Sequence, residues 1–478
     1  MNVCMFVKNS FEYDARVTKE ARSLVGAGHR VTVVAIHVPG ITAEREHRPD
    51  GIDVVRVPRL QFGLGALQRR QRRFVTKIEE RHARLTGEAI DEERIRRNAT
   101  LLQASTATPG DAAPAGGITG ISHGHGGEVP GSAGLWARTS TALMRGAASV
   151  VRLGVSAARR VLIWPARALK TWSLNRRFVR AGLATGADVW HCHDLNTLYA
   201  GSVCKRRRPG TRLVYDSHEL ATERSRMSAM RRRWARWNER RGLPFADEVV
   251  LTTATRAAHV AGIYGIPTPT VLRNVPERIE IEQGWDLRER LGIDPDDRIL
   301  LYQGSIQEFR GIEETIDALG HLERCVFVVI GYGHHRPALE AMVQRRGLGG
   351  RVRFFGPIPN DQLLWYTASA DVGMCVIRGT SLSYRWSMPN KLFEYMMAGI
   401  PVVASDYEEM GRVVREEGVG EVCDPGDPAD IARAVRAVLD APDGATAYRE
   451  AARRAVERFN WDVEQQVLLD LYERLGAR

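Results

Sequence analysis

Runs of apolar residues, many of them β-branched, alternate with longer stretches of helical periodicity along much of the chain. The first run covers residues 3–7, and a helical pattern over 15–27 separates it from a second run at 31–35. Gly28 stands where a helix C-cap belongs. Unbroken apolar runs are typical of strands covered on both faces, and their alternation with helices indicates parallel strands joined by right-handed crossovers. The pattern therefore predicts a doubly wound α/β unit.

The same alternation resumes after residue 185 and begins again near residue 299. In the first unit, further strands are expected at 188–191, 211–216, 247–252 and 270–272. In the second unit, strands are expected at 299–302, 326–330, 352–355, 372–376 and 401–404. The sequence thus predicts two doubly wound, Rossmann-like α/β domains, the first over residues 1–274 and the second over 275–456.

A long insertion interrupts the first predicted domain, from about residue 60 to about 185. It is far longer than an ordinary connection between a strand and a helix. Its first part, 67–103, has the mixed charges of a solvated helix. Residues 104–134 are rich in Gly, Ala, Ser, Thr and Pro, and we expect them to be disordered.

The last part of the insertion, about 135–182, is predicted to form basic amphipathic helices. Four arginines recur every seven residues and so drift by only about 20° per step around a helix. They are Arg138, Arg145, Arg152 and Arg159, and Trp164 and Trp172 follow them. A basic helix with interfacial tryptophans and no acids is typical of an element that lies on anionic lipid. The alternative is a helix that covers the core and turns its arginines outward. A second basic and aromatic cluster, at 224–237, is compatible with the same face.

The composition shows that the positive charge is local. The chain has 478 residues, of which 44% are hydrophobic and 26% charged, so it is long enough to form two hydrophobic cores. Its net charge is +11. Residues 129–187 hold ten Arg or Lys and no Asp or Glu, which leaves about +1 on the rest. We do not expect a nucleic-acid partner, because the basic stripe is flanked by interfacial aromatics and no zinc-finger spacing or RNP-like strand is present.

The sequence also bears on the compartment. No window is apolar enough to span a membrane, and the N-terminal apolar run lacks the basic start and cleavage site of a signal peptide. Six scattered cysteines without C-x-x-C spacing argue against a disulfide framework or a zinc ribbon. We therefore expect a cytoplasmic protein that attaches peripherally to the inner face of the cell membrane.

Two glycine-rich turns follow predicted strands of the second domain. Gly331-Tyr332-Gly333 suits either a phosphate at a helix start or a tight turn that needs glycine for packing, and both interpretations stay open. Arg336 stands where a dinucleotide fingerprint has its third glycine, which argues against an NAD site. In the segment 304–311, Arg310 is placed to clamp a diphosphate at the carboxyl edge of the sheet.

A third motif, at 388–403, predicts a helix that begins at a proline and carries Lys391 and Glu394 on one face. A cation at a helix start opposes the helix dipole, so Lys391 is better explained by an anionic ligand than by stability. Only six of the 68 cationic residues are lysines, which adds weight to Lys391. Glu394 is suited to accept hydrogen bonds from two vicinal ribose hydroxyls.

Together these motifs resemble the family-4 retaining glycosyltransferases of the GT-B fold. The matching segments are residues 14–29, 191–194, 215–220, 303–311, 331–333 and 389–401. They cover both domains and leave out only the insertion. The resemblance implies two domains that face each other across a cleft, with a nucleotide-sugar donor held by the second domain and an acceptor by the first. It also implies that a final helix, within 457–478, packs back on the first domain.

The resemblance assigns roles residue by residue. Glu394 resembles the family glutamate that binds the donor ribose, and Lys391 and Arg310 resemble contacts to the leaving diphosphate. His218 resembles the cleft histidine at the end of a strand of the first domain. The expected catalytic residues are His218, Arg310, Lys391 and Glu394. The expected donor-binding residues are Gly304, Ser305, Arg310, Gly331, Gly333, Asn390, Lys391 and Glu394. The expected acceptor-side residues are Asp14, Arg16, His193, Asp194 and His218.

Neither a metal nor a cofactor is expected; the donor is a nucleotide-diphosphate sugar of the UDP or GDP type. No Asp-x-Asp lies between two apolar stretches. His191 and His193 point to the same face of their strand, since side chains alternate, but a structural or acceptor-side role is favoured over a metal. We expect front-face attack by an acceptor hydroxyl, with His218 positioning or buffering its proton.

Two departures from the family pattern leave alternatives open. Trp386 stands where many relatives have a second glutamate, and Ser305 stands where many have arginine. The expected function is transfer of a sugar to a lipid-linked or cell-surface polysaccharide precursor. The alternatives are a GT-B-fold sugar-nucleotide epimerase and a catalytically weak membrane-associated scaffold.

Overall fold

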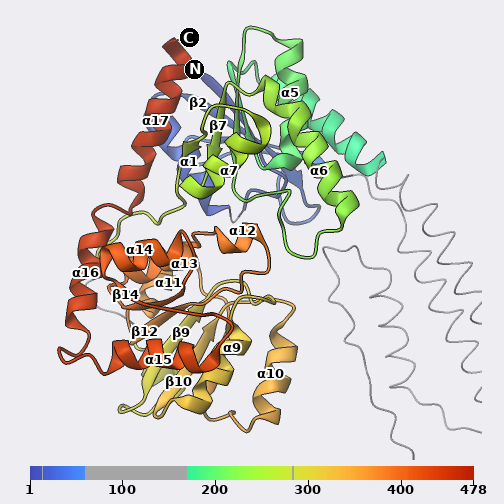
Figure 1. Cartoon of the computed structure of the whole chain (residues 1–478). Helices are drawn as coiled ribbons and strands as arrows, with labels where there is room; N and C mark the ends of the chain where they lie inside the picture. Colours follow the sequence, from blue (N-terminus) through green and yellow to red (C-terminus); the bar gives the residue numbers. More distant parts are fainter. Residues whose placement is uncertain (13, 60–168, 282–284, 478) are drawn as a thin grey trace, which may run out of the picture. The chain divides into compact units, whose positions relative to one another are not determined.

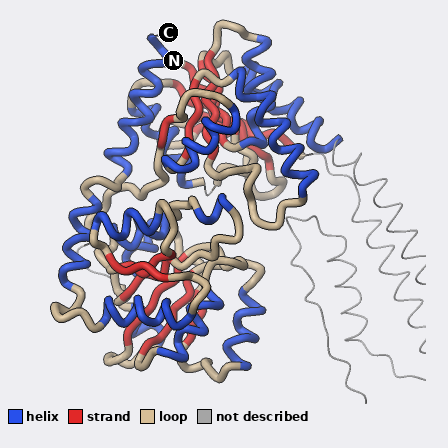
Figure 2. The backbone as a smooth tube through the Cα atoms, in the orientation of Figure 1, coloured by secondary structure: helices blue, strands red, loops and turns tan. Residues whose placement is uncertain are grey.

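A computed structural model describes residues 1–12, 14–59, 169–281 and 285–477. Two open sheets, each flanked by helices, dominate these residues (Figures 1 and 2). The first sheet has eight strands in the order β3-β4-β2-β1-β5-β6-β7-β8. Every neighbouring pair in it is parallel except β3 and β4. Its strands are β1 Asn2–Phe6, β2 Arg30–His37, β3 Arg45–His47, β4 Asp53–Pro58, β5 Val189–His193, β6 Arg212–Ser217, β7 Glu248–Leu251 and β8 Thr270–Val271.

The second sheet has six parallel strands in the order β11-β10-β9-β12-β13-β14. Its strands are β9 Arg298–Gln303, β10 Cys325–Ile330, β11 Val352–Phe355, β12 Val372–Cys375, β13 Val402–Ser405 and β14 Gly420–Cys423. The prediction of two doubly wound α/β domains is confirmed. The predicted strands are all present, and β3, β4 and β14 are additional.

The helices that cover the first sheet are α1 Ala15–Gly26, a helix over residues 169–184, α5 Leu195–Arg207, α6 Ala229–Gly242, η1 Leu243–Phe245 and α7 Ala254–Tyr264. Those of the second domain are α8 Leu287–Leu291, α9 Ile312–Ala318, η2 Leu319–His321, α10 Arg336–Arg345, α11 Asn360–Thr367, α12 Leu382–Arg385, α13 Asn390–Met397, α14 Met410–Glu417, α15 Pro428–Leu439 and α16 Thr446–Val456. Within the described residues, every helix is too short or too polar to cross a bilayer.

The end of the predicted insertion differs from the expectation. Residues 175–184 belong to the first compact unit, and Phe178 is buried with its ring 6.0 Å from that of Phe6. The last turns of the predicted basic segment therefore complete the core of the first domain. Trp172 is described and 53% exposed. The predicted disordered segment and the remaining predicted membrane residues, Arg138, Arg145, Arg152, Arg159 and Trp164, lie outside the described residues.

A last helix, α17 Trp461–Ala477, returns from the second domain to pack against α1 of the first. Trp461 is buried and its Nε1 donates to Ser23 Oγ at 2.9 Å. The Lys19 ammonium lies 4.9 Å from the centre of the Trp461 ring. Leu468, Leu471 and other apolar side chains of α17 join the same core cluster as β1 and β2.

Candidate active site

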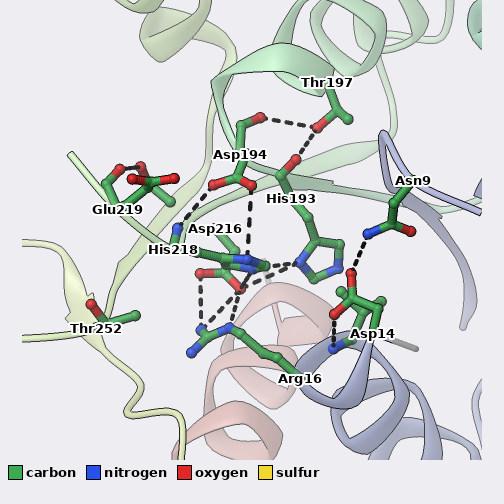
Figure 3. A network of polar contacts seen from close by, with 12 residues as sticks. Asn9, Asp14, Arg16, His193, Asp194, Thr197, Asp216, His218, Glu219 and Thr252 are labelled. Atoms are coloured by element: carbon green, nitrogen blue, oxygen red, sulfur yellow. Dashed lines mark hydrogen bonds and ion pairs between the residues drawn. The ribbon is translucent and has the colours of Figure 1, made fainter. Parts of the chain in front are cut away.

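Polar side chains gather where two neighbouring strands of the first sheet end (Figure 3). β5 ends at His193 and β6 ends at Ser217, and carboxyl ends of parallel strands share one edge of a sheet. His193 Nδ1 lies 3.2 Å from His218 Nε2, and the same His218 nitrogen lies 3.1 Å from Asp216 Oδ2. The structure therefore brings together His193, Asp194 and His218, three of the predicted acceptor-side residues.

Arg16, another predicted acceptor-side residue, is tied to Asp216. Its side chain is buried, and its guanidinium donates to both oxygens of Asp216 at 3.0–3.2 Å and to the carbonyl of Leu272 at 3.1 Å. Its Nε lies 2.9 Å from Glu20 Oε1. Arg16 thus holds the Asp216 carboxylate in place, and its predicted contact with an acceptor stays a prediction.

This arrangement sets the charges of the edge. Burial alone raises the pKa of Asp216, but Arg16 and His218 outweigh it and hold that pKa well below its usual value. Burial alone lowers the pKa of His218, but Asp216 and Asp194 outweigh it and raise that pKa to about 9. His218 is therefore cationic at neutral pH and acts as a hydrogen-bond donor.

Asp194 has a strained backbone. Its φ of 65° and ψ of 160° fall in a region that is almost restricted to glycine. Its N–H donates to the carbonyl of Asp216 at 2.7 Å, and its Oδ1 accepts from the backbone N–H of His218 at 3.3 Å. These bonds hold the strained residue beside His218, and strain of this kind concentrates at functional sites.

Asp14, the remaining predicted acceptor-side residue, begins α1. Its Oδ1 accepts from the N–H of Val17 at 3.2 Å, which is an N-cap bond. Its Oδ2 accepts from the side-chain amide of Asn9 at 2.6 Å. Both carboxylate oxygens therefore have partners within the first domain.

The edge also contains a group of possible metal ligands. Glu20, His191, His193 and Asp216 are buried and offer ligand atoms within 4.8 Å of one another. The two histidine rings stack at 4.4 Å, as alternation along β5 predicts. Arg16, however, already places a fixed cation against both carboxylates. A divalent ion would have to displace or face that guanidinium, so the residues fit a charge network better than a metal.

The predicted donor-side residues lie in the second domain. Lys391, in the first turn of α13, is buried, and its ammonium has no hydrogen-bond partner among the described residues. It lies 3.4 Å from the centre of the Tyr302 ring. Burial, with the charge of Arg310 nearby, lowers the pKa of Lys391 to about 7. A buried ammonium without a partner is costly unless a ligand supplies one.

Glu394 lies one turn further along α13, and its Oε2 accepts from Gln303 Nε2 at 2.6 Å. Thr367 Oγ1 donates to the amide oxygen of Gln303 at 2.7 Å and so fixes the orientation of that amide. Burial raises the pKa of Glu394. Asn390, the first residue of α13, is exposed.

Arg310 is presented by a turn with two left-handed residues. Phe309 has a φ of 65° and Gly311 a φ of 72°. A Cβ at Gly311 would lie 2.4 Å from the carbonyl oxygen of Val376, so only glycine fits. The guanidinium stands 5.0 Å from the centre of the Tyr384 ring, and its Nε is buried without a hydrogen-bond partner among the described residues.

The glycine-rich turns serve close packing of two loops. A Cβ at Gly331 would lie 2.0 Å from the carbonyl oxygen of Gly304, and one at Gly333 would lie 1.9 Å from that of Ile306. The N–H groups of Gly304 and Gly331 donate to backbone carbonyls, at 3.0 and 3.3 Å. Of the two interpretations of these glycines, the contacts favour packing. Ser305 is exposed, and its carbonyl accepts from the Tyr302 hydroxyl at 2.7 Å.

Two family models match the chain. That of the glycosyl transferases group 1 matches residues 283–455, and that of the glycosyl transferase 4-like domain matches residues 107–274. Together they cover more than half of the sequence. The boundary between the two matches falls between β8, the last strand of the first sheet, and β9, the first strand of the second sheet along the chain. The protein is a family-4 glycosyltransferase of the GT-B fold.

Curated relatives of this glycosyltransferase match part of it. It is 30% identical over 251 residues to a D-inositol 3-phosphate glycosyltransferase of Xylanimonas cellulosilytica. The aligned region covers 49% of this chain and 58% of the relative. It is 29% identical over 210 residues to a phosphatidyl-myo-inositol mannosyltransferase of Mycobacterium leprae. Here the aligned region covers 42% of this chain and 54% of the relative. The chain thus spans less than two thirds of the length of these two relatives.

Two solved structures share the fold. A sucrose-phosphate synthase of Thermosynechococcus elongatus superposes with a TM-score of 0.67 at 16% identity, covering 100% of this chain and 99% of that one. The Anabaena protein Alr3699/HepE, solved in complex with UDP, superposes with a TM-score of 0.60 at 15% identity, covering 100% of both chains.

Trp386 stands where the family resemblance led us to expect a glutamate. The Trp386 ring packs edge-on against His259 at 4.9 Å, and its carbonyl accepts from Thr253 Oγ1 at 3.3 Å. It joins a cluster of first-domain residues around Leu220 and Leu251. The tryptophan thus gives the second domain an apolar contact with the first.

Several residues of this glycosyltransferase site were not assigned from sequence. Asp216 anchors the acceptor-side network, Glu20 adds a second carboxylate, and Gln303 orients Glu394. The spacing of Arg16 and Glu20, four apart on one helix, was an available signal. The contact of Tyr472 with His191, 281 residues apart at 2.9 Å, had no sequence signal.

Proposed function

We propose that this glycosyltransferase uses a nucleotide-diphosphate sugar and transfers the sugar, with retention and without a metal, to a lipid-linked or cell-surface polysaccharide precursor. The observation that carries the proposal is the ammonium of Lys391, which is buried and has no hydrogen-bond partner among the described residues. Arg310 stands close enough to lower its pKa, and Glu394 follows one turn later. Two cations beside a carboxylate suit a diphosphate attached to a ribose.

The donor side has the charges that the reaction needs. When the bond between the anomeric carbon and the diphosphate breaks, its electron pair leaves with the phosphate oxygen. Lys391 and Arg310 are already fixed by the protein and stabilise that charge with little reorganisation. Glu394, held by Gln303, is left to accept hydrogen bonds from the ribose hydroxyls.

On the acceptor side, His218 is better suited to orient the acceptor hydroxyl by donating a hydrogen bond than to remove its proton. His218 is already protonated at neutral pH, because Asp216 and Asp194 raise its pKa to about 9. In front-face attack, the acceptor oxygen bonds the anomeric carbon on the side from which the diphosphate departs. The hydroxyl proton then passes to the departing phosphate oxygen, while His218 orients the acceptor.

The relatives guide the choice of substrates. One curated relative is named as a mannosyltransferase acting on phosphatidyl-myo-inositol, and another as acting on D-inositol 3-phosphate. The Anabaena protein of the same fold is solved with UDP and with UDP-glucose, which makes UDP the first nucleotide to test. A lipid-linked acceptor is consistent with a cytoplasmic enzyme attached to the inner face of the membrane.

Calorimetric titration with UDP, GDP and ADP, in magnesium or in chelator, tests the donor half. We expect one nucleotide to bind equally well in both conditions. Lys391→Met should weaken that binding by about thirty-fold or more, because it removes a buried charged partner. Glu394→Ala should weaken it too, and Arg453→Gln, an exposed change on α16, should not. A folded protein that binds none of the three nucleotides would favour the scaffold alternative.

Transfer itself is tested with the nucleotide sugar that binds and with membrane extract as the acceptor. Nuclear magnetic resonance of the product should show the same anomeric configuration as the donor. An epimerised nucleotide sugar without transfer would instead support the epimerase alternative.

A further inference from the structure

Helix α6 is firmly anchored on one side. Its buried face consists of Ala235, Glu239 and Gly242. The Glu239 carboxylate accepts hydrogen bonds from the hydroxyls of Tyr215 and Tyr264 at 2.7 and 2.6 Å. A Cβ at Gly242 would lie 2.4 Å from a methyl carbon of Leu198, so α6 approaches α5 closely. The helix is therefore a fixed part of the first domain.

The opposite side of α6 is apolar where water is expected. At 100° per residue, Met230, Trp234 and Trp237 fall in one row, away from Ala235 and Glu239. Their exposed fractions are 70%, 58% and 53%. Among the helices that the structure describes, α6 alone exposes three large apolar side chains. A row of this kind on a soluble domain indicates a contact surface.

Cations flank this row. Arg233 and Arg240 lie beside it and form no ion pair with any described residue, and the Arg241 guanidinium stands 4.7 Å from the centre of the Trp237 ring. The only acid of the helix, Glu239, is turned inward. Other arginines of the basic cluster at 224–237 are paired with carboxylates at 2.7 Å. They are Arg224 with Glu219, Arg226 with Glu308, and Arg236 with Glu223. Because these three arginines are paired, Arg233 and Arg240, which no described carboxylate neutralises, are left as cations on the outer face of α6.

We propose that this face docks the enzyme on an anionic phospholipid bilayer, with α6 lying in the plane of the headgroups. The docking face consists of Met230, Arg233, Trp234, Trp237, Arg240 and Arg241. Tryptophan rings are favoured at the boundary between headgroups and acyl chains, and arginines are attracted to anionic lipid. The apolar residues form the centre of the face and the cations its flanks, which suits a bilayer better than a nucleic-acid backbone.

The position of α6 connects docking to the reaction. The chain runs from His218, at the edge of the first sheet, to Ser228, the N-cap of α6, through ten residues. Because a segment of that length spans at most about 35 Å, docking through α6 would hold His218 within that distance of the N-terminal end of the docked helix. This part of the inference rests on the proposed function, since it takes the acceptor to be lipid-linked. The docking itself does not depend on it.

Co-sedimentation of the full chain with vesicles tests the proposal. The vesicles contain phosphatidylcholine alone or phosphatidylcholine with phosphatidylglycerol. We expect binding only when phosphatidylglycerol is present. The double variant Arg233→Gln/Arg240→Gln should bind about thirty-fold more weakly, since it removes two cations from the lipid surface. Trp234→Ser/Trp237→Ser should weaken binding by a step that remains at high salt, because it removes apolar contacts.

A matched control is Arg453→Gln/Arg454→Gln, which removes two exposed cations from α16 and should leave vesicle binding unchanged. Unaltered binding of both α6 variants would overturn the proposal, as would equal binding to phosphatidylcholine alone. Binding to duplex DNA without binding to vesicles would overturn it in favour of a nucleic acid.

The nucleotide titration separates this inference from the proposed function. The α6 variants should bind the nucleotide as the unmodified chain does, which also shows that they are folded. If the unmodified chain binds vesicles through α6 but binds no nucleotide, the docking surface stands and the proposed transfer fails.

Discussion

At the scale of single residues, the shifted pKa values of Lys391 and His218 each give a pH dependence of known sign. Lys391 is held near neutrality by burial, and His218 is held cationic by two carboxylates. Lys391 lies in the second domain and His218 in the first, so the two can be tested independently.

Nucleotide binding should take up a proton at alkaline pH. The pKa of Lys391 is about 7 without a ligand, and a diphosphate beside the ammonium should raise it. Above pH 7 the affinity should therefore fall, by up to about tenfold per pH unit. Calorimetry in buffers of different ionisation enthalpy measures the uptake directly. Lys391→Met provides the control, because its weaker affinity should not follow this slope, and a flat profile in the unmodified enzyme would contradict the prediction.

His218 should stabilise the first domain most at low pH. Its pKa is raised from 6.5 to about 9, so its contribution is complete below about pH 6.5 and is lost as the pH rises through 9. His218→Gln should lower the free energy of unfolding by about 2 kcal/mol near pH 6.5 and by much less above pH 9. Urea unfolding at the two pH values measures this. A loss that is equal at both would show that the side chain acts through packing alone.

Part of the site could be predicted at this scale, and part could not. Lys391 and Glu394 share one turn of a helix, so their sequence spacing was enough to place them on one face. Arg16 was assigned to the acceptor because its loop matches the family pattern. Its actual partner, Asp216, lies 200 residues away, and no local pattern reports such a contact.

At the scale of elements, the burial of a strand decided whether its sequence pattern predicted it. The predicted strands are nearly continuous apolar runs, whereas the strands that were missed are short or mixed. β3 is exposed throughout, β4 contains Arg56, and β14 begins with Gly420 and Glu421. Strands at or near sheet edges are covered less, so their patterns resemble those of loops.

The turns after β9 and β10 should be intolerant of a single methyl group. Gly331 has a φ of 141°, and a Cβ there would lie 2.0 Å from the carbonyl oxygen of Gly304. Gly331→Ala should therefore destabilise the second domain by about 3 kcal/mol or more. Gly320→Ala is the matched control, since nothing lies within 4 Å of a Cβ at that position. Thermal unfolding compares the two, and equal midpoints would contradict the packing interpretation.

At the scale of the whole molecule, α17 makes the fold of the first domain depend on residues beyond the second. Glu464 of α17 accepts from Arg273 at 2.7 Å, and Tyr472 reaches His191 beneath the acceptor-side histidines. These contacts bring sequence-distant residues into one core. They depend on the path of the chain, which the pattern of any one element does not specify.

Trp461→Ala should destabilise the first domain, although Trp461 comes after the second domain in the sequence. Trp461 is buried against α1 and bonds Ser23, so its removal should cost about 3–5 kcal/mol. Hydrogen exchange should show faster exchange in β1 and β2. Val463→Ala, at a position 45% exposed on the same helix, should leave exchange unchanged. Protection lost only in the second domain would contradict this account.

The return of α17 also has a consequence for the order in which the chain is made. A ribosome completes β8 at Val271 and α17 only at Ala477. At bacterial and eukaryotic elongation rates, that interval lasts roughly 10–40 s. During it, the apolar surface of α1 that α17 will cover is open. The first domain is therefore completed only after the second has been made, and it is the part of the nascent chain that a chaperone would be expected to hold.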